Sequence, residues 1–501
     1  MQMPTHGNSY WNITSPPSEF PVLTEDLQVD VAIVGAGIVG TTTARLLKDR
    51  GYSVALIEAH RVGRQATGKS TAKVTSQHSL IYQQIEQKFG MSHAQLYASA
   101  QQGGIELIQS LIEKHQIRCD LEPRPAYTYT LRDEHVAEIE KEVDITQQLG
   151  LPSSLVHHSD LPFNILAAIR YDHQFQFHPT RYVAGLAETL PGDGCHVFES
   201  SPVVDWSADH VATARGSVRA NHIVIATHLP LGQIGGYYTR AFPNAEPVIV
   251  AKVADSLDGM YLNVEDPSHS LRFYRDPEGN QYAIAAGTSF KPGHPDEERK
   301  HFQDLESWLV THFSAEPMYR WVNEDYTSMD SVPFVGRSTS IGSDYLVATG
   351  FAGWGLSNGS AAAIMLRDLI AGTSNPWHEL FDAKRFKPLA GGPKLLKESS
   401  QVLTHLVSGY LSRKPTSYEE LNTTEAAIVK SDGKRIAAFK DENGVLHAVS
   451  AICPHMGCVV GWNETDRTWD CPCHGSRFAL DGTVLHGPAA QPLKKIDEGQ
   501  R

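Results

Sequence analysis

Short apolar runs separated by glycine turns and helical patterns occupy the first three quarters of the chain. Residues 30–34 are predicted to form a short buried strand, residues 41–49 a helix and residues 53–57 a second strand. Two later runs, at 221–228 and 344–358, predict further strands, and the second of them passes into a glycine-rich turn.

The pattern changes after about residue 375. Prolines and glycines then surround one amphipathic stretch, residues 395–411, which predicts a helix that belongs either to a linker or to the end of the first domain. From Ala426 onward, short β-like runs are broken by turns, and Asp441-Glu-Asn-Gly444 is typical of a hairpin. We therefore expect a small antiparallel β domain near the C-terminus.

The length of the chain and this break predict several domains. A chain of 501 residues is long enough for two or three. We expect an N-terminal extension at 1–28, a main domain at 29–375, a linker with a helix at 376–417 and a C-terminal domain at 418–501.

Charge and apolar content narrow the range of partners. A net charge of -14 at pH 7 would repel nucleic acid and anionic membranes at long range. No stretch approaches the roughly 18 to 20 apolar residues that span a bilayer, and residues 1–29 lack the basic start and apolar run of a secretory signal. We expect a cytoplasmic protein that binds no nucleic acid and has no transmembrane segment. An oligomer remains open.

A glycine fingerprint follows the first predicted strand. The strand runs into Gly35-Ala-Gly37-Ile-Val-Gly40, and the second strand ends at Glu58. Gly35 permits a tight turn, Gly37 lets the backbone approach a pyrophosphate, and Gly40 lets the helix pack closely on the strand. The helix N-terminus attracts phosphate, and Glu58 would accept hydrogen bonds from a ribose. The context predicts dinucleotide binding without choosing between FAD and NAD.

Residues 28 to 375 resemble the FAD-dependent amine and amino-acid oxidases of the D-amino-acid oxidase superfamily, which includes glycine oxidase and sarcosine oxidase. The resemblance rests on the fingerprint, on the segments 67–73, 330–336 and 350–355, and on the strand at 221–228. It implies a Rossmann-like α/β FAD-binding domain, interleaved along the chain with an α+β substrate domain of antiparallel sheet. It also implies these FAD-binding residues: Gly35, Gly37, Gly40, Glu58, Ser70, Thr71, Lys73, Val203, Gly353, Trp354, Gly355 and Leu356.

The same resemblance implies an enzyme that oxidises a C–N bond of an amine or an amino acid. Arg240, Arg272 and Tyr274 lie in stretches that would then face the FAD domain, and each could bind a carboxylate or orient an amine as a catalytic residue. Most surface arginines do neither, so a structural role is the alternative.

Four of the six cysteines fall close together near the C-terminus, which favours a metal site over a disulfide framework. Two predicted loops carry Cys453-Pro-His455 and Cys471-Pro-Cys473-His474. A Cys2His2 zinc site would use the same residue types, although zinc sites rarely pair C-x-H with C-x-x-H. The spacing closely resembles the Rieske family, in which two thiolates hold one iron of a 2Fe-2S cluster and two imidazoles hold the other. The resemblance implies Cys453, His455, Cys471 and His474 as the ligands.

Two further features come with the Rieske resemblance. Cys458 and Cys473 match the subclass found in cytochrome bc complexes, in which a disulfide ties the two cluster loops together. Ser476 matches a hydrogen-bond donor of the high-potential members, but Phe478 stands where those members have a tyrosine. Losing that hydroxyl should destabilise the reduced cluster, so we expect a reduction potential below that of the respiratory-chain proteins.

The two resemblances together predict a route for electrons. The substrate would give a hydride to the flavin, and the flavin would pass electrons singly to the cluster and on to an external acceptor that the sequence does not identify. The alternative is a reductase or electron-transfer protein whose cluster exchanges electrons with a partner protein. A reductase would need a second NAD(P) fingerprint, which we do not find in the sequence.

Overall fold

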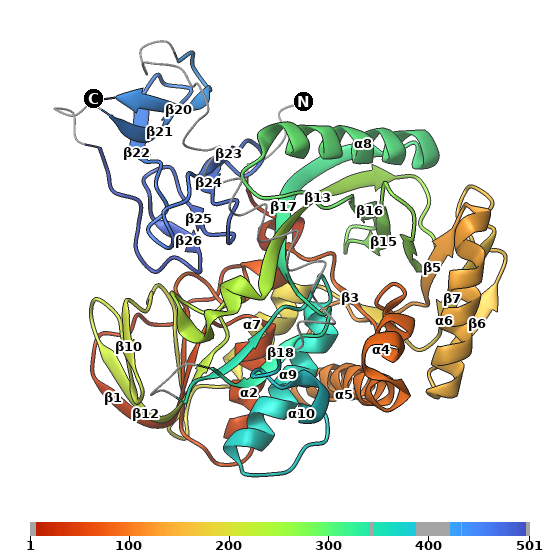
Figure 1. The fold of residues 1–501 in the computed structure, drawn as a ribbon, viewed down its shortest axis with the longest axis horizontal. Coiled ribbons are helices and arrows are strands. Elements are labelled where there is room, and N and C mark those ends of the chain that lie inside the picture. The colour runs from red at the N-terminus through yellow and green to blue at the C-terminus, as the bar shows by residue number, and fades with distance from the viewer. Residues whose placement is uncertain (1–6, 340–343, 387–420, 432, 497–501) are drawn as a thin grey trace.

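The computed structural model describes residues 7–339, 344–386, 421–431 and 433–496. Figure 1 shows two large sheets with their helices and, in blue, a small β unit that lies against them; we call residues 421–496 the C-terminal unit. The helix predicted at 395–411 lies outside the described residues. The domain borders expected near residues 375 and 417 therefore stay predictions.

The first sheet is mostly parallel and contains the strands predicted at 30–34 and 53–57. β1 (Leu27–Val34) pairs in parallel with β12 (Ser217–Ile225) on one side and with β2 (Val54–Ile57) on the other. Residues 31–34 are buried, as expected for a central strand covered on both faces. The remaining strands are β9 (His196–Phe198) and β19 (Leu346–Thr349), both paired in parallel, and the antiparallel β10 (Asp205–Ser207), β11 (His210–Ala212) and β18 (Phe334–Arg337).

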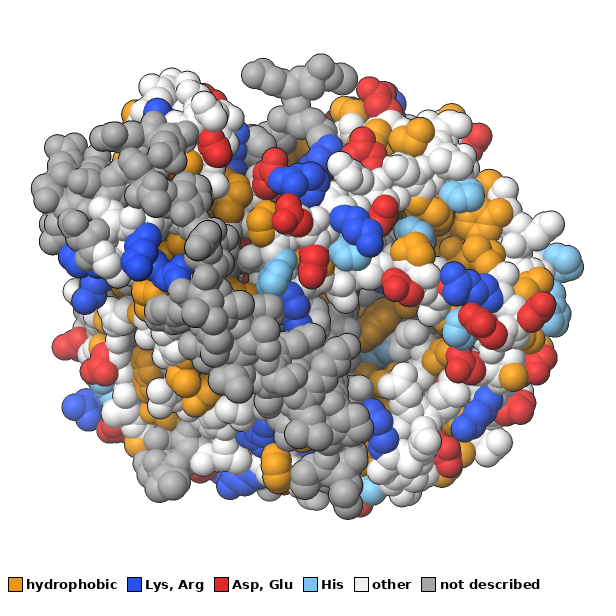
Figure 2. All heavy atoms as spheres, turned by 45° about the horizontal axis from the view of Figure 1, so that its top comes forward, with side chains coloured by type: hydrophobic (Ala, Val, Ile, Leu, Met, Phe, Trp, Pro, Cys, Tyr) orange, Lys and Arg blue, Asp and Glu red, His pale blue; other side chains and the backbone are white. Residues whose placement is uncertain are grey.

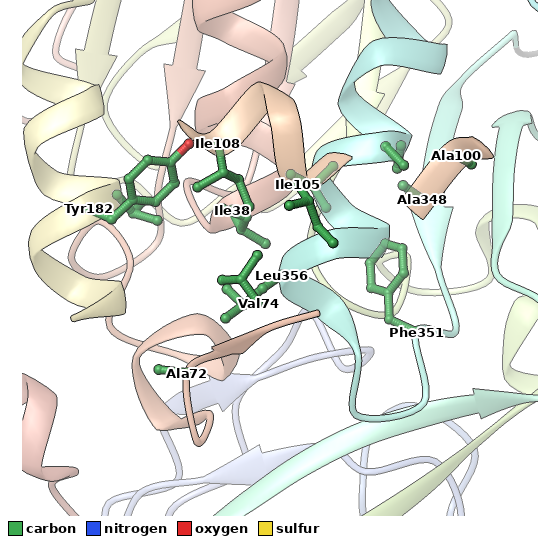
Figure 3. Packing of buried hydrophobic residues seen from close by; sticks show 14 of the residues in the cluster. Ile38, Ala72, Val74, Ala100, Ile105, Ile108, Tyr182, Ala348, Phe351 and Leu356 are labelled. Carbon is green, nitrogen blue, oxygen red and sulfur yellow. The ribbon is translucent and has the colours of Figure 1, made fainter. Parts of the chain in front are cut away.

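Three long helices pack together beside this sheet. α2 (Ile38–Lys48) contacts α9 (Gly355–Ile370), and α9 also contacts α5 (Met91–His115). Figure 3 shows apolar side chains from all three helices in one buried cluster, among them Ile38, Ile105 and Leu356. α2 and α9 begin three and four residues before the predicted positions 41 and 359, because the helices start directly after the glycine turns.

The second sheet has the order β17-β13-β16-β15-β14-β5-β7-β6, and its neighbours are antiparallel except β14 and β5. Its strands flank β12 in sequence, so the expected interleaving of an α/β and an antiparallel domain is confirmed. Helix α8 (Pro295–Phe313) packs on β13, and α6 (Val136–Gln148) packs on β6 and β7. The strand bounds are β5 (Ala126–Thr130), β6 (Ser153–Val156), β7 (Ala167–Tyr171), β13 (Ala241–Val253), β14 (Met260–Asn263), β15 (Ser270–Arg275), β16 (Gln281–Ala286) and β17 (Glu316–Ser328).

Short elements connect the two large sheets. A small sheet has the order β3-β8-β4. The short strands and remaining helices are β3 (Lys73–Val74), β4 (Glu122–Pro123), β8 (Phe175–Gln176), α1 (Tyr10–Ile13), α3 (Ala66–Lys69), α4 (Ile81–Phe89), α7 (Pro179–Glu188), α10 (His378–Phe381) and the 3-10 helices η1 (Asp133–His135) and η2 (Ile234–Thr239).

The C-terminal unit is all β, as expected. One sheet has the order β20 (Ala426–Ser431), β21 (Lys434–Lys440) and β22 (Leu446–Ser450), and the predicted turn at 441–444 joins its last two strands. The second sheet has the order β23 (Gly461–Asn463), β24 (Thr468–Asp470), β25 (Arg477–Phe478) and β26 (Val484–His486).

On the face in Figure 2, basic and acidic side chains are intermixed. Within the described ranges, no helix combines the length and the apolar character needed to cross a bilayer.

Candidate active site and metal centre

A cavity of about 490 Å³ lies where the two large sheets and the C-terminal unit meet. Its walls come from the turn after β1, from β13 and β17, from the stretch 351–356 before and within α9, and from residues between 484 and 490 of the C-terminal unit. Of the twelve residues predicted to bind FAD, all but Gly40 line this cavity. Their individual contacts with a cofactor stay predictions.

The turn between β1 and α2 leaves no room for side chains. Gly35 has a φ of +100°, and a Cβ there would lie 2.6 Å from the carbonyl oxygen of Ala226 on the neighbouring strand end. A Cβ on Gly40 would lie 1.9 Å from the carbonyl oxygen of Gly35. Gly37 caps α2 without a side chain, so the helix N-terminus faces the cavity with its positive dipole end. These features fit a pyrophosphate.

Glu58 is held in place at the end of β2. Its Oε2 accepts a hydrogen bond from the Ala36 N–H at 2.8 Å, and its Oε1 accepts one from the His60 N–H at 2.9 Å. Burial raises the pKa of the Glu58 carboxyl. A carboxylate offers about four acceptor positions, so Glu58 retains capacity for the hydroxyl groups of a ribose.

The start of α9 forms another wall of the cavity. Trp354 stacks on His78 with a ring separation of 4.6 Å. His78 is itself fixed, because Nδ1 lies 2.7 Å from the Tyr97 hydroxyl and Nε2 lies 2.9 Å from Ser357 Oγ. Burial lowers the pKa of His78 to about 3, so the ring is neutral. His78 therefore supports the wall and does not line the cavity.

The structure does not bring Arg240, Arg272 or Tyr274 to the cavity. Arg272 is fully buried and donates to the carbonyl of Ala72 at 2.7 Å, with its guanidinium over the Trp11 ring. Arg240 donates to backbone carbonyls, and Tyr274 donates to Asp120 at 2.8 Å. Ser270 lies on the same face of β15 as Arg272 and Tyr274, and it does line the cavity. Farther along β15 the N-terminal segment around Trp11 covers this face, which separates Arg272 and Tyr274 from the cavity.

A group of polar side chains lines the cavity near β13 and β17, and the sequence interpretation had named only Lys73 of them. We call it the polar wall: Lys73, Glu246, Ser270, Asn323 and Asp325. Burial and the neighbouring Asp325 together raise the pKa of Glu246 to about 7, whereas burial and Arg272 lower the pKa of Lys73 to about 7. In the sequence, the one signal for this group was Glu246, a charged residue inside an apolar strand pattern.

The four predicted metal ligands come together between two loops of the C-terminal unit. Cys453 and Cys471 are buried and hydrogen-bond to each other. The rings of His455 and His474 lie 5.1 Å apart, and burial lowers the pKa of both. The buried Nδ1 of His455 has no hydrogen-bond partner among the described residues. Two thiols and two neutral imidazoles form the donor set of a Rieske cluster, so the residues fit that group.

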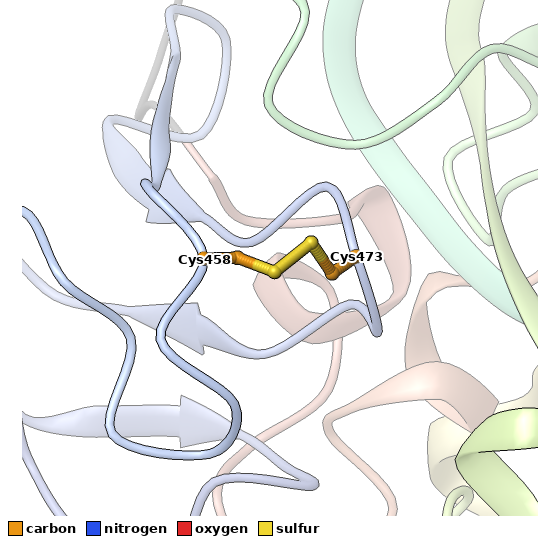
Figure 4. Close-up of a disulfide and its surroundings, with 2 residues drawn as sticks. All are labelled: Cys458 and Cys473. Atoms are coloured by element: carbon orange, nitrogen blue, oxygen red, sulfur yellow. A yellow bond between two sulfur atoms is a disulfide. The ribbon is translucent and has the colours of Figure 1, made fainter. Parts of the chain in front are cut away.

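A disulfide joins Cys458 to Cys473, as the Rieske resemblance implied. Figure 4 shows the bond linking the two loops. The sulfurs of Cys458, Cys471 and Cys473 lie within 4.8 Å of one another, but two of them form this bond, which leaves Cys471 to act with Cys453.

Replacing both Cys458 and Cys473 by serine should destabilise the C-terminal unit. The bond closes a loop of 15 residues, and releasing such a loop costs about 3 kcal/mol of unfolding free energy. Amide hydrogen exchange in the full-length chain measures the loss. Cys195→Ala, which removes a free thiol elsewhere, is the control. Unchanged protection of β20 to β26 in the double variant would contradict this prediction.

Buried charges join the C-terminal unit to the rest of the chain. Arg477 donates to Asp466 at 2.8 Å and to Asp470 at 3.0 Å, and its Nε lies 3.7 Å from Glu324 on β17. Lys69 of α3 donates to the same Asp466 at 2.7 Å. Burial raises the pKa of Glu324 to about 8, while Lys69 and Arg477 hold the pKa of Asp466 low against its burial. The two parts are therefore held by an ion network as well as by packing.

The metal ligands themselves contact the main domain. His455 Nε2 lies 3.0 Å from the carbonyl oxygen of Gly232, and the Tyr238 ring packs edge-on against both His455 and His474. Tyr326 donates its hydroxyl to the backbone carbonyl of His474 at 3.1 Å. The segment around η2 and strand β17 of the main domain thus contact the histidine side of the metal centre.

A histidine of the C-terminal unit also reaches the cavity. His486 lines the cavity, and its Nε2 lies 3.2 Å from Nδ1 of His228. His228 Nε2 in turn lies 2.7 Å from Asp325 of the polar wall, whose other oxygen accepts from the Gly353 N–H. His228 ends the strand predicted at 221–228, whereas no local sequence pattern indicated His486.

Two family models match the chain. Residues 30–369 match the family described as FAD dependent oxidoreductase, and residues 416–497 match the Rieske [2Fe-2S] domain. The first match covers the two large sheets and the cavity walls that lie outside the C-terminal unit. The second covers the C-terminal unit and all four predicted metal ligands.

Individual relatives agree with this division. The chain is 35% identical over 98% of its length to YhfW of Bacillus subtilis (strain 168), whose name describes a Rieske 2Fe-2S iron-sulfur protein and of which 97% is covered. It is 25% identical over 78% of its length to gamma-glutamylputrescine oxidoreductase of Escherichia coli (strain K12), of which 93% is covered. The crystal structure of glycine oxidase from Geobacillus kaustophilus superimposes with a TM-score of 0.57 at 16% identity, over 72% of this chain and all of that one, which shows a shared fold.

Together, the family matches, the glycine turn and the Cys2His2 donor set establish both cofactors. The first family binds FAD, and the Rieske domain binds a 2Fe-2S cluster. The chain therefore belongs to the FAD dependent oxidoreductase family and carries a Rieske [2Fe-2S] domain in its C-terminal part.

Proposed function

We propose that this protein oxidises a C–N bond of an amine or amino acid in the cavity and delivers the electrons through its own Rieske centre to an external acceptor. When bound, FAD accepts a hydride and can give up the two electrons one at a time, and the cluster is a one-electron carrier. The observation that carries the proposal is that residues 484–490 of the Rieske domain form part of the cavity that the FAD-binding turn opens on.

We assign the cofactor contacts to the residues that the sequence predicted. Gly35 and Gly37 leave the pyrophosphate room beside the α2 N-terminus, and Glu58 would hold the ribose. Ser70, Thr71, Lys73 and Val203 line the same cavity, and Gly353, Trp354, Gly355 and Leu356 would lie along the flavin ring. Cys453, His455, Cys471 and His474 would hold the cluster.

The alternative, a module whose cluster exchanges electrons only with a partner protein, fits the structure less well. In Rieske centres the imidazoles hold one of the two irons. Here the His455 ring is hydrogen-bonded to Gly232, and Tyr238 packs on both histidines. A partner would have to displace these contacts to reach that edge, whereas the chain's own flavin cavity adjoins it.

Anaerobic titration of the holoprotein with a panel of amines and amino acids tests the proposal. Flavin and cluster absorb visible light differently, so the two can be followed separately. We expect at least one compound to bleach the flavin within seconds and the cluster to become reduced afterwards. No bleaching by any compound, combined with reduction of the cluster by a partner protein, would favour the alternative.

Phe478→Tyr should raise the reduction potential of the cluster. Phe478 is fully buried on β25, two residues after Ser476. A hydroxyl that donates to the cluster or to a ligand thiolate would favour the more negative reduced state by about 1.5 kcal/mol, which corresponds to about 60 mV for one electron. Redox titration followed by EPR measures the shift. Phe439→Tyr, a buried phenylalanine stacked on Trp462 in the same unit, should change the potential little; an equal shift in both variants would refute the prediction.

A further inference from the structure

We infer that the cavity takes an amine that has no carboxylate on the reacting carbon, and that Glu246 holds the amino group of this substrate. The inference rests on the proposed function and narrows its substrate class. The sequence suggested Arg240 and Arg272 as substrate-binding residues. The inference assigns substrate binding to the carboxylate of Glu246, which the fold brings to the cavity.

Two paired strands present Glu246 to the cavity. Glu246 on β13 lies directly opposite Asn323 on β17 in the antiparallel register. Residues opposed in this way project from the same face of a sheet, and both of these line the cavity. The Asn323 side chain hydrogen-bonds to Glu246. Glu246 lies on a long strand that is paired with a second long strand, so its carboxylate is more rigidly placed than one on a loop.

The polar wall adjoins the start of α9. Asp325 lies two residues beyond Asn323 and therefore on the same strand face. One oxygen of Asp325 accepts a hydrogen bond from the Gly353 N–H, and the other lies 2.7 Å from His228 Nε2. The wall is thus next to the turn that, by family resemblance, runs along the flavin ring. This is the end of the cavity where a substrate would meet the reacting part of the cofactor.

The charges of this wall suit an amine better than an amino acid. A substrate carboxylate is best held by an arginine, whose guanidinium makes two parallel hydrogen bonds. The arginines among the described lining residues are Arg61, which donates to Glu199 at 2.8 Å, and Arg64, which donates to backbone carbonyls of Asn12 and Ser15 at 2.8 and 2.7 Å. Both are already engaged, and both lie near the end of β2.

Lys73 is a weak substitute for such an arginine. Its ammonium donates to Ser270, interacts with Glu246, and has a pKa lowered to about 7, so much of it is uncharged near neutral pH. A carboxylate bound there would also lie beside Glu246 and Asp325, which repel it. An ammonium group, by contrast, lies beside Asp325 and Glu246, and its positive charge favours the ionised form of Glu246.

Glu246 can also prepare the amine for oxidation. An ammonium R–CH2–NH3⁺ that binds to ionised Glu246 gives it one proton and becomes R–CH2–NH2, whose nitrogen lone pair is then free. FAD, when bound, would be the oxidant that takes the C–H bond with its electron pair, and the lone pair would form the C=N bond of R–CH=NH2⁺. The proton stays on Glu246, so charge and electrons balance.

A pair of unreactive probes separates binding from chemistry. tert-Butylamine and 2-aminoisobutyrate both lack a hydrogen on the carbon that carries nitrogen, and they differ by one carboxylate. Titrated into the oxidised holoprotein and followed by the flavin absorbance, tert-butylamine should bind at least tenfold more tightly. Glu246→Gln should weaken tert-butylamine at least tenfold and change 2-aminoisobutyrate little. Tighter binding of 2-aminoisobutyrate, or no effect of Glu246→Gln, would overturn the inference.

Two controls distinguish a failure of this inference from a failure of the proposed function. Glu142→Gln alters a buried carboxyl that accepts from the Tyr82 and Gln83 N–H groups away from the cavity, and it should leave the binding of both probes unchanged. The reactive pair n-butylamine and norvaline, which again differ by one carboxylate, completes the test. Flavin bleaching by norvaline but not by n-butylamine refutes the inference alone, whereas bleaching by no amine or amino acid refutes the proposed function.

Discussion

Gly40→Ala is expected to abolish stable FAD binding. The added Cβ would lie 1.9 Å from the carbonyl oxygen of Gly35, so α2 must move away from β1 at the turn that leaves room for the pyrophosphate. Overpacking against backbone costs up to about 3 kcal/mol. Because this cost falls on the conformation of the turn that binds FAD, we expect a roughly hundredfold weaker affinity for FAD. FAD retained after gel filtration, and its dissociation constant for the apoprotein, measure the effect.

Gly51→Ala is the matched control for this variant. Gly51 follows α2, and a Cβ there meets nothing within 4 Å, although its φ of +83° makes alanine mildly strained. We expect FAD affinity to stay within about twofold of the parent, because the strain of about 1 kcal/mol lies far from the turn. If Gly40→Ala kept FAD as tightly as Gly51→Ala does, the assignment of the turn to the pyrophosphate would be wrong.

Arg477→Met should separate the Rieske domain from the main domain or unfold it. The substitution leaves Asp466 and Asp470 buried with less cationic compensation, and among the described residues Lys69 is the cation that remains paired with Asp466. Removing one partner of a buried ion pair typically costs about 3–5 kcal/mol. Denaturant unfolding of the full chain, together with iron content, measures the loss.

An exposed ion pair across the same interface provides the control. Arg299 of α8 donates to Glu464 of the Rieske domain at 3.0 Å, and both side chains are more than half exposed. Because exposed pairs contribute little, Arg299→Met should cost under about 1 kcal/mol. Equal losses in the two variants would show that the buried network does not hold the domains together.

Sites built from neighbouring residues could be predicted from the sequence. The glycine turn, Glu58 and the four cluster ligands each lie on one strand end or one loop, so spacing alone indicates their chemistry. The interleaved α/β and antiparallel domains came from the family resemblance, and the sheet orders agree with it.

The substrate end of the cavity could not be predicted in this way. Glu246 and Asn323 meet because β13 and β17 pair in one particular register, and the strands lie about eighty residues apart in the chain. Arg272 looked available in the sequence, yet Trp11 and the carbonyl of Ala72 bury it. His486 reaches the cavity only because the Rieske domain docks there, and no local pattern carries that information.

Rapid mixing under anaerobic conditions tests the central claim most directly. The holoprotein is mixed with a reducing amine, and flavin and cluster reduction are recorded at protein concentrations that differ tenfold. The structure predicts that the flavin is reduced first and that the cluster follows at a rate independent of protein concentration, because donor and acceptor belong to one chain. A cluster that stays oxidised beside a reduced flavin, or a rate that rises in proportion to protein concentration, would contradict it.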